Sequence, residues 1–323
     1  MKGKPIRLKH CIHVAATDID PGGTTNVKHV DALVNGSVLA ARNALDNSCS
    51  RLTEFHRKHL SEIFVSLKHT YDAIRYLIRK GHQSPITVDA MALARIQLET
   101  IYAIALIAEK PESLDIYIKN HWKGHYLRFL HERENYKNLS NRKNFYFTQG
   151  ILILEKLRKD CGVSDDEKST IDSDELGIPL PAGTSAKKIE DFPTPTRALE
   201  RIKTVETRKM LTYLYPEYRH LCSFVHLSPL PKFLKGIFDD RSRYSSLFSQ
   251  GEREEIFHKA VADEALWIGF LSIAQCAAEL ICFYPNDLEL RKTVGDCWEV
   301  LSKSSFPAKS VYEIRTKSLI GII

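Results

Sequence analysis

An arginine, a serine and a histidine recur at helical spacing in the segment from Tyr215 to His226. Arg219 and His226 are seven residues apart. On a helix with about 100° per residue they share nearly the same azimuth, roughly 10 Å apart along the axis. Ser223 falls between them on that face. Arginine holds phosphate groups through charge-assisted hydrogen bonds, and histidine exchanges protons near neutral pH. These residue types at this spacing predict phosphate binding coupled to proton transfer.

The helix that must position these side chains is expected over residues 216–226. Pro216 suits the first helical position, and Glu217 suits the positive end of the helix dipole. Prolines at 229 and 231 are expected to stop the helix. Three apolar residues would hold it against a core: Leu221, Phe224 and Val225.

The stretch from Arg219 to His226 resembles the R-x(4–6)-H motif of the HEPN superfamily (higher eukaryotes and prokaryotes nucleotide-binding). The arginine is followed by the polar His220, and six residues separate it from the histidine. The resemblance covers about one helix. It implies an all-helical, usually dimeric protein in which one motif from each protomer meets at the interface. Many members are metal-independent RNA endonucleases that act as toxins or in antiphage defence.

The resemblance implies a reaction as well as a fold. The RNA 2′-OH would attack the adjacent phosphorus, with His226 as general base or acid and Arg219 stabilising charge on the phosphate oxygens. His220 and Ser223 would orient the phosphate or its partners. The products would be a 2′,3′-cyclic phosphate and a 5′-OH. Single-stranded RNA or a tRNA loop is the expected substrate, because an unpaired 2′-OH can reach in-line geometry.

The wider pattern around Tyr218 also resembles an uncharacterised bacterial family of helical proteins with a Y-R-x-L-S-x-x-V-H-like segment. That family has an upstream helix bearing an arginine and a glutamate, as Arg95 and Glu99 do here. Four residues apart in apolar surroundings, these two share a helix face and need partners. They either pair with each other as a clasp between helices, or they meet the face of Arg219. In the second case Glu99 would tune the motif histidine and Arg95 would add a phosphate donor.

Basic and aromatic side chains alternate in residues 121–147, which makes this segment the candidate RNA-binding surface. Lysine and arginine neutralise phosphates, and aromatic rings stack on unpaired bases. The candidate phosphate contacts are Lys123, Arg128, Arg133, Lys137, Arg142 and Lys143. An alternative stays open. Trp122, Tyr126 and Phe129 fall on one helical stripe, as they would in an amphipathic helix whose aromatic residues face the core.

Metal and cofactor motifs are sparse in this chain. His121 and His125 have the spacing of two ligands on one helix, but the residues between them lack the glutamate of H-E-x-x-H. His56 and His59 stand in a basic context that repels a cation. The sequence contains no Walker loop and no G-x-G-x-x-G. We therefore expect no metal and no cofactor.

Length, charge and cysteine content limit the size of the core, the possible partners and the cellular compartment. The 323 residues can bury a large core, and the net charge of +6 permits nucleic acid as a partner without requiring it. Seven cysteines without a C-x-x-C pair are typical of a reduced, cytoplasmic protein. We expect no signal peptide. No stretch of 18 uninterrupted apolar residues occurs, so no membrane span is expected either.

Hydrophobic periodicity predicts an all-α multi-helix bundle with an irregular N-terminal arm and a polar loop insertion. Helices are expected at 27–50, 52–80, 88–109, 112–160 (one or two), 195–213, 216–226, 250–283 and 286–303. The domain boundaries predicted from this pattern are an arm at 1–50, a helical bundle domain at 51–305 with the insertion at 161–194, and a C-terminal tail at 306–323.

Two further interpretations remain beside the nuclease. The chain could be a non-catalytic helical sensor or interaction module of a defence or regulatory system, with Arg219 and His226 in a buried polar network with Arg95 and Glu99. It could also be an antitoxin-like or regulatory partner of another defence protein, with a basic surface but no catalysis. A partner or inhibitor protein that binds this chain is a further expectation. Cys222, four residues before the motif histidine, is either core packing or a nucleophile.

Overall fold

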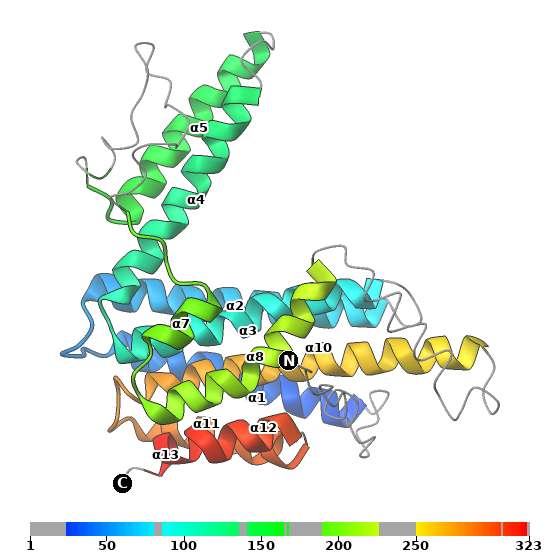
Figure 1. The fold of residues 1–323 in the computed structure, drawn as a ribbon. Coiled ribbons are helices and arrows are strands. Elements are labelled where there is room, and N and C mark those ends of the chain that lie inside the picture. Colours follow the sequence, from blue (N-terminus) through cyan, green and yellow to red (C-terminus); the bar gives the residue numbers. More distant parts are fainter. Residues whose placement is uncertain are drawn as a thin grey trace, which may run out of the picture. The chain divides into compact units, whose positions relative to one another are not determined.

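The computed structural model describes residues 24–80, 86–135, 141–164, 167, 189–225, 250–304 and 306–321. Over these ranges the chain is helical, and its only extended pairing is an isolated bridge between Cys49 and Leu52 (Figure 1). The all-α prediction is confirmed. The chain divides into two compact units, Met1–Glu109 with Ala198–Ile323, and Lys110–Arg197.

The first unit carries the motif helix. Its elements are α1 (Thr24–Asp46), α2 (Glu54–Lys80), α3 (Ile86–Glu109), α8 (Val205–Val225), α10 (Gln250–Leu280), α11 (Leu288–Ser304), α12 (Phe306–Val311), the π-helical turn η2 (Tyr312–Thr316) and α13 (Lys317–Ile320). The short α7 (Pro195–Arg201) spans the boundary between the units.

The core of this unit is built on the packing of α3 against α10. Both helices are buried along most of their length, as expected for a helix that is apolar almost all round. Small residues allow close approach. A Cβ added at Gly269 of α10 would lie 2.9 Å from the Tyr71 ring on α2 and 3.0 Å from the Gln97 amide oxygen on α3. Glycine is therefore required where the three helices meet.

The N-terminal and C-terminal segments are part of this core, which differs from the predicted domain boundaries. Helix α1 contacts α2, α10 and α11 and buries Val34, Ala41 and Ala44. Residues 1–23 lie outside the described residues. At the other end, the Arg291 guanidinium donates to the carbonyls of Leu319 and Ile320. The apolar surface of both segments needs a partner, and the bundle supplies it.

Helix α8 is longer than predicted, and the expected break at Pro216 is wrong. The helix begins at Val205 and runs through Pro216, which lies inside it. Proline removes the amide hydrogen bond to the carbonyl four residues earlier, that of Thr212. Both residues are exposed, so water can solvate that carbonyl. Glu217 consequently lies in mid-helix rather than at the helix N-terminus.

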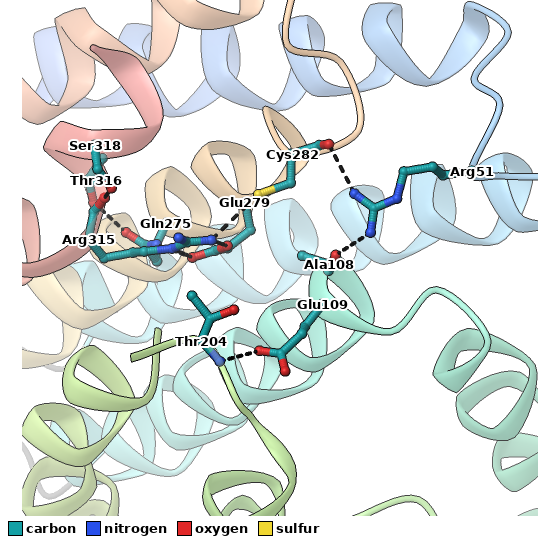
Figure 2. A network of polar contacts seen from close by, with 10 residues as sticks. All are labelled: Arg51, Ala108, Glu109, Thr204, Gln275, Glu279, Cys282, Arg315, Thr316 and Ser318. Atoms are coloured by element: carbon teal, nitrogen blue, oxygen red, sulfur yellow. Dashed lines mark hydrogen bonds and ion pairs between the residues drawn. The ribbon is translucent and has the colours of Figure 1, made fainter. Parts of the chain in front are cut away.

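Side chains from α3 position α8. The Glu109 carboxylate at the end of α3 accepts a hydrogen bond from the backbone amide of Lys203 at 2.6 Å. It accepts a second from the amide of Thr204 at 3.1 Å (Figure 2). These amides precede the first turn of α8, where the helix dipole also favours a negative charge. Further along, the Tyr102 hydroxyl donates to the Leu211 carbonyl at 2.9 Å. Helix α8 is thus held to α3 at its start and in its middle.

A buried ion pair lies at the C-terminal end of α10. The guanidinium of Arg315, on η2, donates to both oxygens of Glu279, at 3.1 and 2.8 Å, and the Glu279 side chain is fully buried (Figure 2). Gln275 donates to the same carboxylate and accepts a hydrogen bond from Thr316. The cluster of Gln275, Glu279, Arg315 and Thr316 is named the Glu279 network below.

The second unit is a helical hairpin with an attached segment. Helices α4 (Ser113–Asn135) and α5 (Asn141–Asp160) pack together, so the region expected to hold one or two helices at 112–160 holds two. The Trp122 indole donates to the Leu154 carbonyl. Residues 189–191 are tied back to α4 through Lys123 and Asn120. Most of the predicted insertion at 161–194 lies outside the described residues.

Two of the described helices are long and apolar enough to cross a membrane: Asp89–Glu109 of α3 and Phe257–Leu280 of α10. Both are largely buried inside the first unit, and the central helices of folded bundles have the same composition. This finding is weak support for a membrane span, and the expectation of none stays a prediction.

Candidate functional site

The C-terminal half of α8 carries most of the predicted site. Its buried side is formed by Leu214, Tyr218 and Leu221. The opposite side faces solvent and carries Arg219. Part-exposed polar groups of α3 flank α8 on one side and those of α10 on the other. These three helices belong to the first unit, so the site is contained in one compact body.

Arg219 is exposed at the centre of the solvent face. Arg208 lies eleven residues earlier and is also exposed. Eleven residues are three helical turns, so the two guanidinium groups share a face about 16 Å apart along the axis. Thr212 lies between them on the same face. His226 lies outside the described residues, directly after the last residue of α8.

On the α3 side, Arg95 contacts Tyr218 rather than Arg219. One Arg95 nitrogen donates to the Tyr218 hydroxyl at 3.4 Å, and the guanidinium lies 5.6 Å from the tyrosine ring centre. The same nitrogen is 3.3 Å from the carboxylate of Glu99. Burial raises the pKa of the Tyr218 hydroxyl. Arg95 therefore joins Glu99 on α3 to Tyr218 on α8 as a clasp between the two helices. Arg219 is not part of this clasp.

On the α10 side, a histidine and two carboxyl groups converge. The Nε2 atom of His220 is 3.6 Å from Oε1 of Glu264, and the two side chains are one quarter to one third exposed. The Glu217 carboxyl lies close enough to Glu264 for its charge to act on it. Desolvation, followed by the like charge of Glu217, raises the pKa of Glu264 well above its usual value. Glu264 therefore keeps its proton to higher pH than an exposed carboxylate does.

Two other motif side chains lie on α8. The Ser223 hydroxyl donates to the His220 carbonyl one turn earlier, at 2.6 Å. Cys222 is half-buried. Ser223 keeps its oxygen lone pairs for an incoming donor.

The predicted RNA-binding residues of the second unit are only partly described. Lys123 is buried, donates to the Ile189 carbonyl and pairs with Asp191 at 2.7 Å, so it is used inside the unit. Arg128 is exposed and pairs with Glu132. Four others have side chains outside the described residues: Arg133, Lys137, Arg142 and Lys143. Trp122, Tyr126 and Phe129 are buried, as the amphipathic alternative expects.

Among the described residues, no group of three or more histidine, cysteine, aspartate or glutamate side chains could hold a metal ion. His121 and His125 do lie together, with ring centres 4.7 Å apart, and both are exposed. Their edge-to-face contact is a helix surface pair.

Sequence reasoning missed Glu264 and assigned Glu217 to the wrong place. The signal for Glu264 is an acidic residue at the start of an apolar stretch, Ala265–Leu271. A charge at such a position needs a polar partner from another helix. The identity of that partner depends on the packing of α8 against α10.

Residues 58–241 of the chain match a family described as a family of unknown function (DUF5677). The matched region includes Arg95, Glu99, Arg219 and His226, and it covers more than half of the 323 residues. The comparisons with curated proteins and with solved structures returned no match. The chain therefore belongs to the DUF5677 family.

Proposed function

We propose that this chain is a HEPN-like, metal-independent RNA endonuclease whose reaction is carried by Arg219 and His226. The proposal includes a cytoplasmic homodimer and a role as a toxin or antiphage effector. The observation that carries it is the exposure of Arg219 on a helix that packs against α3 and η2. A guanidinium fixed at a helix surface is suited to the non-bridging oxygens of a phosphodiester.

The contacts around α8 support the chemistry of transesterification. Arg219 neutralises the charge that grows on the phosphate oxygens in the transition state. His226, seven residues later in the sequence, takes the proton from the 2′-OH. Ser223 accepts a hydrogen bond from a substrate hydroxyl, because its own proton is donated to the His220 carbonyl. The 2′-oxygen forms a bond to phosphorus, the bond to the 5′-oxygen breaks, and the products are a 2′,3′-cyclic phosphate and a 5′-OH.

The basic face of α8 supports RNA as the substrate. Arg208 and Arg219 are spaced for two phosphates of one strand on the same face. This face belongs to the same compact body as the chemical residues. It therefore contributes more directly to substrate placement than the predicted segment at 121–147, where Lys123 is used internally.

The test compares the purified wild-type chain with the Arg219→Ala/His226→Ala double variant on total RNA and tRNA, with EDTA present. Circular dichroism confirms that both are folded. We expect cleavage by the wild-type chain alone, with ends that carry a cyclic phosphate. Cleavage by both proteins, or by neither, overturns the proposal.

A second candidate function is a non-catalytic helical interaction module. The observation that favours it is the clasp of Arg95, Glu99 and Tyr218, which joins α3 to α8 without help from the motif arginine. In that case Arg219 serves as a surface contact for a partner protein. A folded wild-type chain that cuts no RNA but is captured through Arg219 by a partner supports this alternative.

A further inference from the structure

RNA transesterification needs an acid as well as a base, because the 5′-oxygen leaves as an alkoxide unless it is protonated. The proposed function assigns one histidine to this work. A second imidazole, His220, stands on α8 beside the arginine that holds the phosphate. Unlike Arg219, it has a carboxyl partner on a neighbouring helix.

The surroundings of His220 are those of a proton donor. Glu264 Oε1 lies 3.6 Å from its Nε2 atom, and the ring meets Phe224 edge-on on the other side. A nearby carboxylate stabilises the charged imidazolium and fixes the orientation of the ring. His220 is still about one quarter exposed, so a substrate oxygen can reach it.

The carboxyl partner is itself one of a pair. Glu217 lies one turn before His220 on α8, and its carboxyl is close enough to Glu264 to act on its charge. The Glu217 Oε1 atom is buried and finds no hydrogen-bond donor among the described residues. A proton held by Glu264 would satisfy this oxygen, because two carboxylates in contact cannot both be ionised at low cost.

We propose that His220 is the general acid that protonates the leaving 5′-oxygen, and that Glu264 is the positioning residue that orients the His220 ring through the 3.6 Å contact between them. This inference rests on the proposed function. The 2′-oxygen bonds to phosphorus and gives its proton to the base. The bond from phosphorus to the 5′-oxygen breaks, and that oxygen takes a proton from His220. The imidazole takes up a proton from water before the next turnover.

The experiment replaces the leaving group. An RNA oligonucleotide spanning the cleavage site mapped on tRNA is made with either the natural 5′-oxygen or a bridging 5′-sulfur. A thiolate leaves without protonation, so a variant that lacks only the acid recovers on the sulfur substrate. On the oxygen substrate we expect His220→Ala to lower kcat roughly 10²-fold, the lower end of the range for acid–base catalysis, with KM little changed. On the sulfur substrate its rate should approach that of the wild-type chain.

Glu264→Gln should show the same pattern with a smaller loss, because glutamine preserves the shape but replaces one carboxyl oxygen by an amide nitrogen that cannot accept a hydrogen bond from the imidazole. Glu255→Gln, an exposed change on the same helix, is the control and should behave as wild type on both substrates. If His220→Ala is unfolded by circular dichroism, His220→Gln takes its place.

The outcomes separate the two proposals. A His220 variant that is equally slow on both substrates, or fully active on the oxygen substrate, overturns this inference while the nuclease assignment stands. Arg219→Ala should be slow on both substrates, because the thiolate does not replace phosphate binding. A wild-type chain that cuts neither substrate, or an Arg219→Ala chain that cuts normally, overturns the proposed function and this inference with it.

Discussion

Helix α10 carries two buried or half-buried glutamates in opposite circumstances. Glu279 is fully buried, receives both arms of Arg315 and accepts a further hydrogen bond from Gln275. Glu264, about four turns earlier, is part-exposed and faces another carboxyl and a histidine at 3.6 Å. The first charge is matched by a fixed opposite charge, and the second is placed against a like charge.

The difference separates polar groups that hold the fold together from polar groups that are available for chemistry. A buried ion pair whose groups already have hydrogen-bond partners has little left to offer a ligand, so its role is to hold η2 against α10. A part-exposed cluster that holds a proton costs stability and remains open to solvent. Such clusters are typical of functional sites. The following variants test this division, from the largest expected effect to the smallest.

Arg315→Ala should cause the largest loss of stability. It leaves the Glu279 carboxylate buried without a partner, which costs about 3–5 kcal/mol of unfolding free energy. Lys317→Ala, two residues away, removes an exposed pair with Glu313 and should cost no more than about 1 kcal/mol. Urea unfolding followed by circular dichroism measures both. If the two substitutions lowered the unfolding free energy equally, the Glu279 network would stabilise the fold no more than an exposed ion pair does.

Arg219→Ala should affect cleavage and leave stability unchanged. Loss of a charged donor to the transition state costs roughly 10²–10³ in rate. An exposed substitution changes the unfolding free energy by no more than about 0.5 kcal/mol. Tm and the rate of tRNA cleavage in EDTA measure the two effects. Lys259→Ala removes an exposed charge from α10 and is the control for simple loss of positive charge.

Arg219→Lys sharpens the same test. Lysine keeps the charge but loses the planar fork that fits two phosphate oxygens, so cleavage should be intermediate between that of the wild-type chain and that of Arg219→Ala. A lysine variant as active as wild type would show that charge alone is needed. In that case the arginine serves as a general RNA contact rather than as a stabiliser of the transition state.

Tyr102→Phe should destabilise the chain moderately, by about 1 kcal/mol, because it removes the buried hydrogen bond to the Leu211 carbonyl. Tyr218→Phe removes a longer, part-buried contact with Arg95 and should cost less. Thermal unfolding of the two variants under the same conditions compares them. The reverse order would place the main clasp between α3 and α8 at Arg95 rather than in the core.

The helices of the core could be predicted from sequence because apolar periodicity alone determines them. The helix expected at 88–109 is α3, Ile86–Glu109, and the one expected at 286–303 is α11, Leu288–Ser304. Pro216 shows where local rules fail. A proline is tolerated in mid-helix when the carbonyl that it leaves unpaired faces water, and exposure depends on packing rather than on neighbouring residues.

The site could be predicted less well than the fold. The sequence places Arg219, His220 and Ser223 on one helix, and the structure describes all three there. The sequence alone does not decide whether Arg95 meets Arg219 or Tyr218, since adjacent residues of a helix point about 100° apart. Glu264 was missed because its partners lie on a helix more than forty positions away in the sequence. Only the tertiary fold brings them together.

Glu264→Gln should have the smallest effect, and it appears in the pH dependence of stability. The pKa of Glu264 is raised in the folded chain above the ordinary value of 4.5, so the folded state keeps a proton that the unfolded state releases. Between these two pKa values the unfolding free energy of the wild-type chain should therefore fall as pH rises. Glutamine cannot titrate, and the variant should lose this slope and be slightly more stable than the wild-type chain at neutral pH. Urea unfolding at a series of pH values from 4 upward measures the slope, with Glu255→Gln as the exposed control. Identical slopes in wild type and variant would mean that Glu264 is ionised like any surface carboxylate, and the contrast with Glu279 would then be one of burial alone.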